Sequence, residues 1–97
     1  MGIEYSLRFA AQDAEAVADL LRSLPGATAS TSPYAAPGLC FDLGVGPAED
    51  GWPEATIQVE PGGAYFCDHC GGGGQAFLER VVSSLESYFG AVTVEEL

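Results

Sequence analysis

The apolar residues of this chain recur with two different periods, and the order of these periods limits the fold. Apolar and polar residues alternate near both ends of the chain and through its middle, as is typical of strands with one buried face. Two intervening segments carry apolar residues three and four positions apart, as is typical of helices with one buried stripe. The predicted order is strand, helix, several strands, helix, strand.

The two helical segments have clear boundaries. Asp13 precedes the first helix, where its side chain can accept hydrogen bonds from free backbone amides, and Pro25-Gly26 ends it. The second helix is expected from about residue 75 to residue 89, with Gly90 as its C-terminal stop. The apolar stripe of the first helix contains Val17, Leu20, Leu21 and Leu24. The apolar stripe of the second contains Phe77, Leu78, Val81, Val82, Leu85, Tyr88 and Phe89.

The strand-like segments differ in the strength of their alternation. The pattern is strong over residues 3–9, 39–45, 55–60 and 64–69. Pro61-Gly62 separates the last two of these segments, and this residue pair suits the centre of a type II turn, so we expect a hairpin. The weaker candidates are a short edge strand near residues 28–31, beside a proline-containing loop, and a last strand over residues 91–94.

These patterns favour a single α+β domain over residues 1–97. A chain of this length can bury about 60–70% of its unfolded surface in one core. A two-layer sandwich, with both helices on one face of a mostly antiparallel sheet of four to five strands, buries every apolar face together. A variant of the ferredoxin-like fold would have this arrangement.

The charge of the chain limits its partners. Asp and Glu number 14 against 3 Lys plus Arg, which gives a net charge of −11. Nucleic-acid binding requires clustered basic residues, whereas Arg8, Arg22 and Arg80 lie in three separate segments. We therefore expect no nucleic-acid partner. A strongly negative protein instead attracts basic partners, of which a basic protein is the expected one.

The N-terminus and the cysteine content favour a cytoplasmic protein without membrane association. The segment from Met1 to Tyr5 has neither the basic flank nor the apolar run of a signal peptide. The sequence also has no run of about 20 apolar residues, the length that a transmembrane helix needs. Three cysteines, an odd number, fit a reducing compartment better than a disulfide framework.

Cys67-Asp68-His69-Cys70 is the candidate thiol or metal site. Two thiolates three residues apart converge on a zinc ion, or act as a dithiol, where the chain turns between them. Here the alternation continues through His69, which places Cys67 and Cys70 on opposite faces unless the strand ends at Asp68. A metal site would have to draw on Cys67, His69, Cys70 and Cys40. We predict ordinary reduced cysteines and no cofactor, with the thiol or metal site as the alternative.

Other catalytic arrangements would have to use His69, the single histidine. Cys67 lies two residues away on the same strand face, which corresponds to about 6–7 Å between α-carbons. Asp42 and Asp68 would form a carboxylate pair if their strands placed them face to face. The simpler interpretation is a histidine at the end of a strand, so we do not predict an enzyme.

Residues 71–76 formally match a glycine-rich dinucleotide-binding pattern. The preceding strand is half polar, unlike the apolar strands of a parallel core, and no basic side chain lies near the glycines. We interpret the glycines as a connection that lets the second helix fold back on the sheet.

Two loop aromatics are the candidate contacts with a partner. Trp52 lies between Glu49-Asp50 and Glu54, and Tyr34 lies in the proline-containing loop. Large aromatic residues surrounded by polar groups are often the energetic centre of a protein interface. The alternative is that both rings pack over the end of the core. The predicted partner-binding residues are Trp52, Glu49, Asp50, Glu54 and Tyr34.

The sequence therefore favours a small acidic binding or regulatory module that docks on a basic protein. An inhibitor or immunity-type protein that neutralises a basic toxin is one example. The alternatives are the thiol or metal site around Cys67, His69 and Cys70, and a structural protein that forms homo-oligomers by pairing its edge strands.

Overall fold

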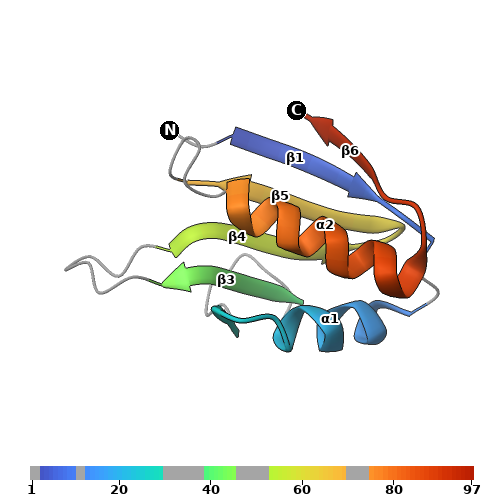
Figure 1. Cartoon of the computed structure of the whole chain (residues 1–97), viewed down its shortest axis with the longest axis horizontal. Coiled ribbons are helices and arrows are strands. Elements are labelled where there is room, and N and C mark those ends of the chain that lie inside the picture. The colour runs from blue at the N-terminus through green and yellow to red at the C-terminus, as the bar shows by residue number, and fades with distance from the viewer. Residues whose placement is uncertain (1–2, 11–12, 30–38, 46–52, 70–74) are drawn as a thin grey trace.

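The computed structural model describes residues 3–10, 13–29, 39–45, 53–69 and 75–97, and only the backbone of residues 29, 45, 53 and 54. Figure 1 shows their arrangement. The elements are β1 (Ile3–Arg8), α1 (Ala14–Arg22), β2 (Ala27–Ala29), β3 (Cys40–Val45), β4 (Pro53–Glu60), β5 (Gly63–Asp68), α2 (Gln75–Phe89) and β6 (Thr93–Glu96).

The strands form one antiparallel sheet in the order β2-β3-β4-β5-β1-β6. Strands β2 to β5 follow one another as a meander, and β1 lies between β5 and β6. Tyr5 in β1 is opposite Phe66 in β5 and Glu96 in β6. The elements β5, α2 and β6 therefore form a crossover around β1.

The hairpin between β4 and β5 closes at Pro61-Gly62, as the sequence predicts. Glu60 is opposite Gly63, so these two residues alone form the connection. Gly62 has a φ of 77°, a left-handed conformation that favours glycine and that a type II turn requires at this position.

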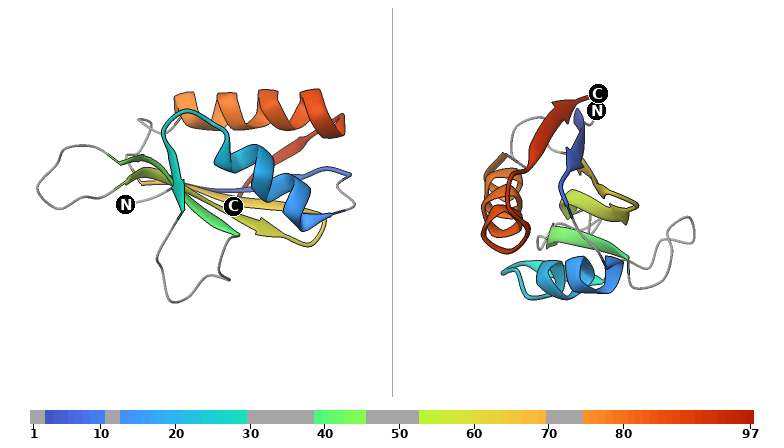
Figure 2. Two further views of the ribbon diagram at one scale, coloured as in Figure 1. Left: turned by 90° about the horizontal axis from the view of Figure 1, so that it is seen from below. Right: turned by 90° about the vertical axis from the view of Figure 1, so that its right-hand side faces the viewer.

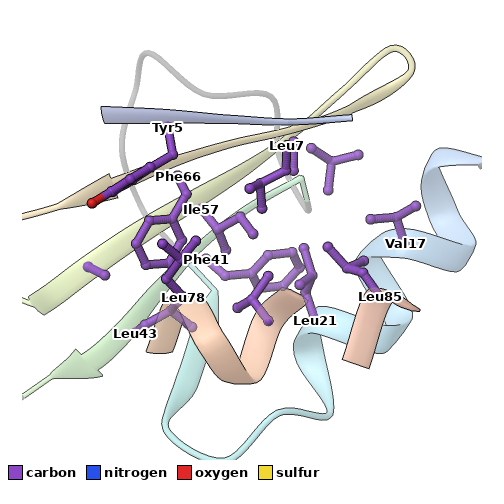
Figure 3. Close-up of a cluster of buried hydrophobic side chains, with 14 of the residues drawn as sticks. Tyr5, Leu7, Val17, Leu21, Phe41, Leu43, Ile57, Phe66, Leu78 and Leu85 are labelled. Carbon is purple, nitrogen blue, oxygen red and sulfur yellow. The ribbon is translucent and has the colours of Figure 1, made fainter. Parts of the chain in front are cut away.

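Both helices lie on the same face of the sheet, where they cover the core (Figure 2). The sheet contributes fully buried side chains such as Leu7, Phe41 and Phe66, and the helices contribute Leu21 and Leu85 (Figure 3). Side chains that alternate along a strand point to opposite faces. The other face of the sheet therefore carries the polar residues of the alternation.

The helix boundaries agree closely with the sequence prediction. Asp13 caps α1, since its Oδ1 accepts a hydrogen bond from the backbone N–H of Glu15 at 2.9 Å. The helix ends at Arg22, with Ser23 as its C-cap, and α2 occupies the expected residues before Gly90. Of the helices in the described parts of the chain, neither has the length and hydropathy to cross a membrane.

The sheet differs from the sequence prediction in its strand count and in one boundary. The described residues form 6 strands rather than four to five, because both weak segments pair, β2 with β3 and β6 with β1. The last strand is Thr93–Glu96 rather than residues 91–94. Val92 packs against the core instead, in the connection between α2 and β6.

Candidate functional site

The face of the sheet opposite the helices, called the polar face here, carries a row of side chains that crosses four strands. Glu4 in β1 is opposite Cys67 in β5, which is opposite Thr56 in β4. Thr56 is in turn opposite Asp42 in β3. Directly opposite residues have Cβ atoms only about 4.5–5.5 Å apart, so these polar groups are close enough to interact.

His69 directly follows β5 and contacts two residues of this row. Its Nδ1 lies 3.7 Å from the Cys67 Sγ, and its Nε2 lies 2.6 Å from the Thr56 Oγ1. When an imidazole is neutral, one of its nitrogens donates and the other accepts, so the thiol and the hydroxyl then take opposite hydrogen-bonding roles. We call Cys67, His69 and Thr56 the thiol–imidazole cluster. It has the order of a nucleophile, a base and a residue that orients the base.

The surroundings of Cys67 favour the protonated thiol. Burial raises the pKa of the thiol, and the nearby Glu4 carboxylate raises it further, whereas the neighbouring Tyr65 hydroxyl lowers it. Tyr65 donates the hydrogen bond of its hydroxyl to Glu4 Oε1. Burial, followed by this bond, raises the pKa of Tyr65, so the phenol keeps its proton. Because the thiolate is the reactive form of cysteine, these shifts weaken Cys67 as a nucleophile at neutral pH.

The described residues do not assemble a metal site. They contain no group of three or more His, Cys, Asp and Glu side chains that could hold a metal ion. Cys40 is buried in β3 opposite Gln58, which is opposite Tyr65, so two strand spacings separate Cys40 from Cys67. Cys70 and the glycine pattern of residues 71–74 lie outside the described residues.

The carboxylate pair considered from the sequence does not form. Asp42 belongs to the polar face, opposite Thr56, whereas Asp68 is opposite Ala55 and is fully buried on the core side. The two side chains therefore point to opposite faces of the sheet. No buried side-chain nitrogen or oxygen in the described parts of the chain lacks a hydrogen-bond partner, so the Asp68 carboxylate is satisfied where it lies.

The predicted partner-binding residues are not placed by the structure. Trp52, Glu49, Asp50 and Tyr34 lie outside the described residues. The backbone of Glu54 belongs to β4, but its side chain is not described. Their role in binding stays a prediction.

The structure shows a groove between α1 and the C-terminal end of α2 that the sequence did not predict. Two cavities of about 370 Å³ and 410 Å³ adjoin there and share Ala16, Tyr88 and Phe89 as lining residues. We call this depression the helix groove. Its remaining lining residues are Ala10, Asp13, Asp19, Leu20 and Ser23.

Tyr88 is the main difference between the predicted and the observed apolar stripe of α2. The sequence places it on the buried stripe, whereas its side chain is 73% exposed. Phe89 instead turns inward and stacks on Phe9, with ring centroids 5.6 Å apart. Ala16 lines the groove together with Tyr88.

Comparisons of the chain with protein-family models, curated proteins and solved structures gave no match.

Proposed function

We propose that this protein is a small acidic binding or regulatory module that docks on a basic protein. The observation that carries the proposal is the spread of exposed carboxylates over both helices and several strands. They are Glu4, Asp13, Glu15, Asp19, Glu60, Glu79, Glu86, Glu95 and Glu96.

The arginines offset little of this negative charge. Arg22 forms a salt bridge with Asp19 at 2.6 Å and lies 5.8 Å from the centroid of the Phe41 ring. Arg80 lies 5.4 Å from the centroid of the Phe77 ring. Both guanidinium groups thus already have partners within the fold. The remaining carboxylates produce a negative field that attracts a basic partner and is screened by salt.

Affinity capture from the native cell extract, at low and at high salt, tests this proposal. The expected result is a basic protein that is retained at low salt and whose purified form associates more slowly as ionic strength rises. A variant with Glu79→Gln and Glu86→Gln, which lowers the negative charge without changing the core, should associate more slowly than the original protein. Salt-independent association, with equal rates for the variant and the original protein, would refute the proposal.

The contacts with the partner are proposed to include Trp52, Glu49, Asp50, Glu54 and Tyr34, on the sequence pattern alone. A cytoplasmic location belongs to the same proposal and is supported by the odd number of cysteines. Pairing of β2 or β6 between copies is the alternative in which the protein is a homo-oligomer.

The fold itself is proposed to be an elaborated ferredoxin-like sandwich. That fold has the element order β-α-β-β-α-β with split βαβ units. Without β2 and β3 the chain has this order, and β1 lies between β5 and β6 as a split unit requires. Here β2 and β3 extend the sheet beyond β4.

A thiol-dependent site is the second candidate function, and the contacts of His69 with Cys67 and Thr56 favour it. In that function Cys67 would be the nucleophile and His69 the base. The raised pKa of Cys67 counts against it. Purification without chelator, followed by native mass spectrometry and melts with added zinc, tests the metal form of this candidate.

A further inference from the structure

The helix groove combines an acidic rim with an exposed aromatic ring. Asp13, Ala16 and Asp19 are spaced three residues apart, so they follow one face of α1 along the groove. Tyr88 and Phe89 form the opposite wall at the end of α2. The two carboxylates and the phenol ring are thus accessible together from the same depression.

The size of the groove suits one or two side chains. Each cavity, at about 370 Å³ or 410 Å³, is near the lower end of the range for small-molecule sites, which begins at about 300 Å³. The acidic rim favours a cation, and the aromatic wall favours a flat or apolar group. A long basic side chain satisfies both conditions.

We infer that the helix groove takes an arginine side chain from the basic partner. A guanidinium group is planar, stacks on aromatic rings and donates to carboxylates in pairs, whereas the ammonium group of lysine is compact and strongly hydrated. This inference rests on the proposed function and assigns it a contact surface.

Asp19, on the rim of the groove, already accepts a hydrogen bond from a guanidinium group, that of Arg22. The Arg22 Nη1 donates to Asp19 Oδ1 at 2.6 Å, and both side chains are more than half exposed. An exposed ion pair of this kind contributes little to stability, so a partner's arginine can compete for Asp19 at small cost. Asp13 uses its Oδ1 to cap α1, and its second oxygen remains able to accept a hydrogen bond.

Titration of the full chain with acetylated, amidated tetra-arginine at low salt, followed by ¹H–¹⁵N NMR, tests the inference. We expect the largest shifts at the amides of Ala16, Asp19, Tyr88 and Phe89. Tyr88→Ala should weaken binding by about 2- to 5-fold, the loss expected from one exposed cation–π contact. Tyr88→Phe, which keeps the ring, should bind like the original protein. Asp19→Asn should weaken binding more than Glu79→Gln, which removes the same charge outside the groove.

The outcomes separate this inference from the proposed function. If tetra-arginine binds in a salt-sensitive way but Tyr88→Ala and Tyr88→Phe bind equally, the groove is not the site, while the acidic docking function stands. If tetra-lysine binds the groove as tightly as tetra-arginine does, the assignment to arginine is wrong. If neither peptide binds at low salt, both the inference and the proposed function fail. Thermal melts of each variant establish that it is folded, as expected for substitutions at exposed positions.

Discussion

Cys67 lies between an imidazole and a carboxylate, and its burial together with the carboxylate sets its reactivity. His69 contacts the sulfur, while Glu4 lies directly across the strand pair. The pKa of the thiol is raised by burial and then by Glu4, so the thiolate forms only above the ordinary range of a cysteine. We expect alkylation of Cys67 by iodoacetamide at pH 8 to be slower than alkylation of an exposed cysteine in a short peptide.

Glu4→Gln should lower the pKa of Cys67 and speed this alkylation, because it removes the negative charge across the strand. Glu60→Gln is the matched control, since Glu60 is opposite Gly63 at the other end of β5 and changes the net charge equally. Mass spectrometry with fragmentation of the peptide between Cys67 and Cys70, over a range of pH, reports the reaction at Cys67 alone. Equal rates for both variants would show that Glu4 does not influence the thiol.

Trp52 is interpreted either as a contact with the partner or as a ring packed over the core, and mutation separates these two interpretations. As a central contact with the partner, Trp52→Ala should speed dissociation by an amount equivalent to about 2 kcal/mol or more. Neutralising Glu49 and Asp50 should instead mainly slow association. Both rates are measured by surface plasmon resonance with the captured partner, in parallel with chemical denaturation. Should Trp52→Ala lower stability and leave affinity intact, the ring belongs to the core.

Leucines of both helices pack directly against the sheet and stabilise the fold. Leu21 and Leu85 are both fully buried, so Leu21→Ala and Leu85→Ala should each cost about 2–5 kcal/mol of unfolding free energy. Leu97, which is 65% exposed, is the matched control, and Leu97→Ala should cost under about 0.5 kcal/mol. Urea denaturation gives all three values. Comparable losses at Leu21 and Leu97 would contradict the assigned core.

Periodicity predicted both helices and the four longer strands (β1, β3, β4 and β5) well, because each of these elements has a one-sided apolar pattern. It placed both helices, the hairpin at Pro61-Gly62 and the common face of Cys67 and His69. It could not place Thr56 beside His69, because this contact depends on the register between β4 and β5. It also misjudged Tyr88, because the exposure of this ring depends on what packs beside the end of α2, which the period of α2 does not contain.

The sheet as a whole shows why weak strand signals are hard to judge from sequence. β2 has three residues and β6 has four, and both lie at edges where a strand needs pairing on one side only. Each becomes a strand because a neighbour in the sheet, β3 or β1, supplies the hydrogen-bonding partners. Such pairing depends on the folded molecule, and the local periodicity of the apolar residues does not predict it.

The charge of the whole molecule should make its stability depend on salt. A net charge of −11 on 97 residues is self-repelling in the compact state, and added ions screen that repulsion. We therefore expect the melting temperature to rise when NaCl is increased from about 0.05 M to about 0.5 M, over which the Debye length falls well below 10 Å. Differential scanning calorimetry measures this change directly. The variant with Glu79→Gln and Glu86→Gln should melt higher at low salt and gain less from added salt, since its exposed charge is smaller. A melting temperature that falls with salt in the original protein would mean that attractive charge pairs within the molecule outweigh the repulsion. The carboxylates would then be paired with groups of the same chain rather than available to a basic partner.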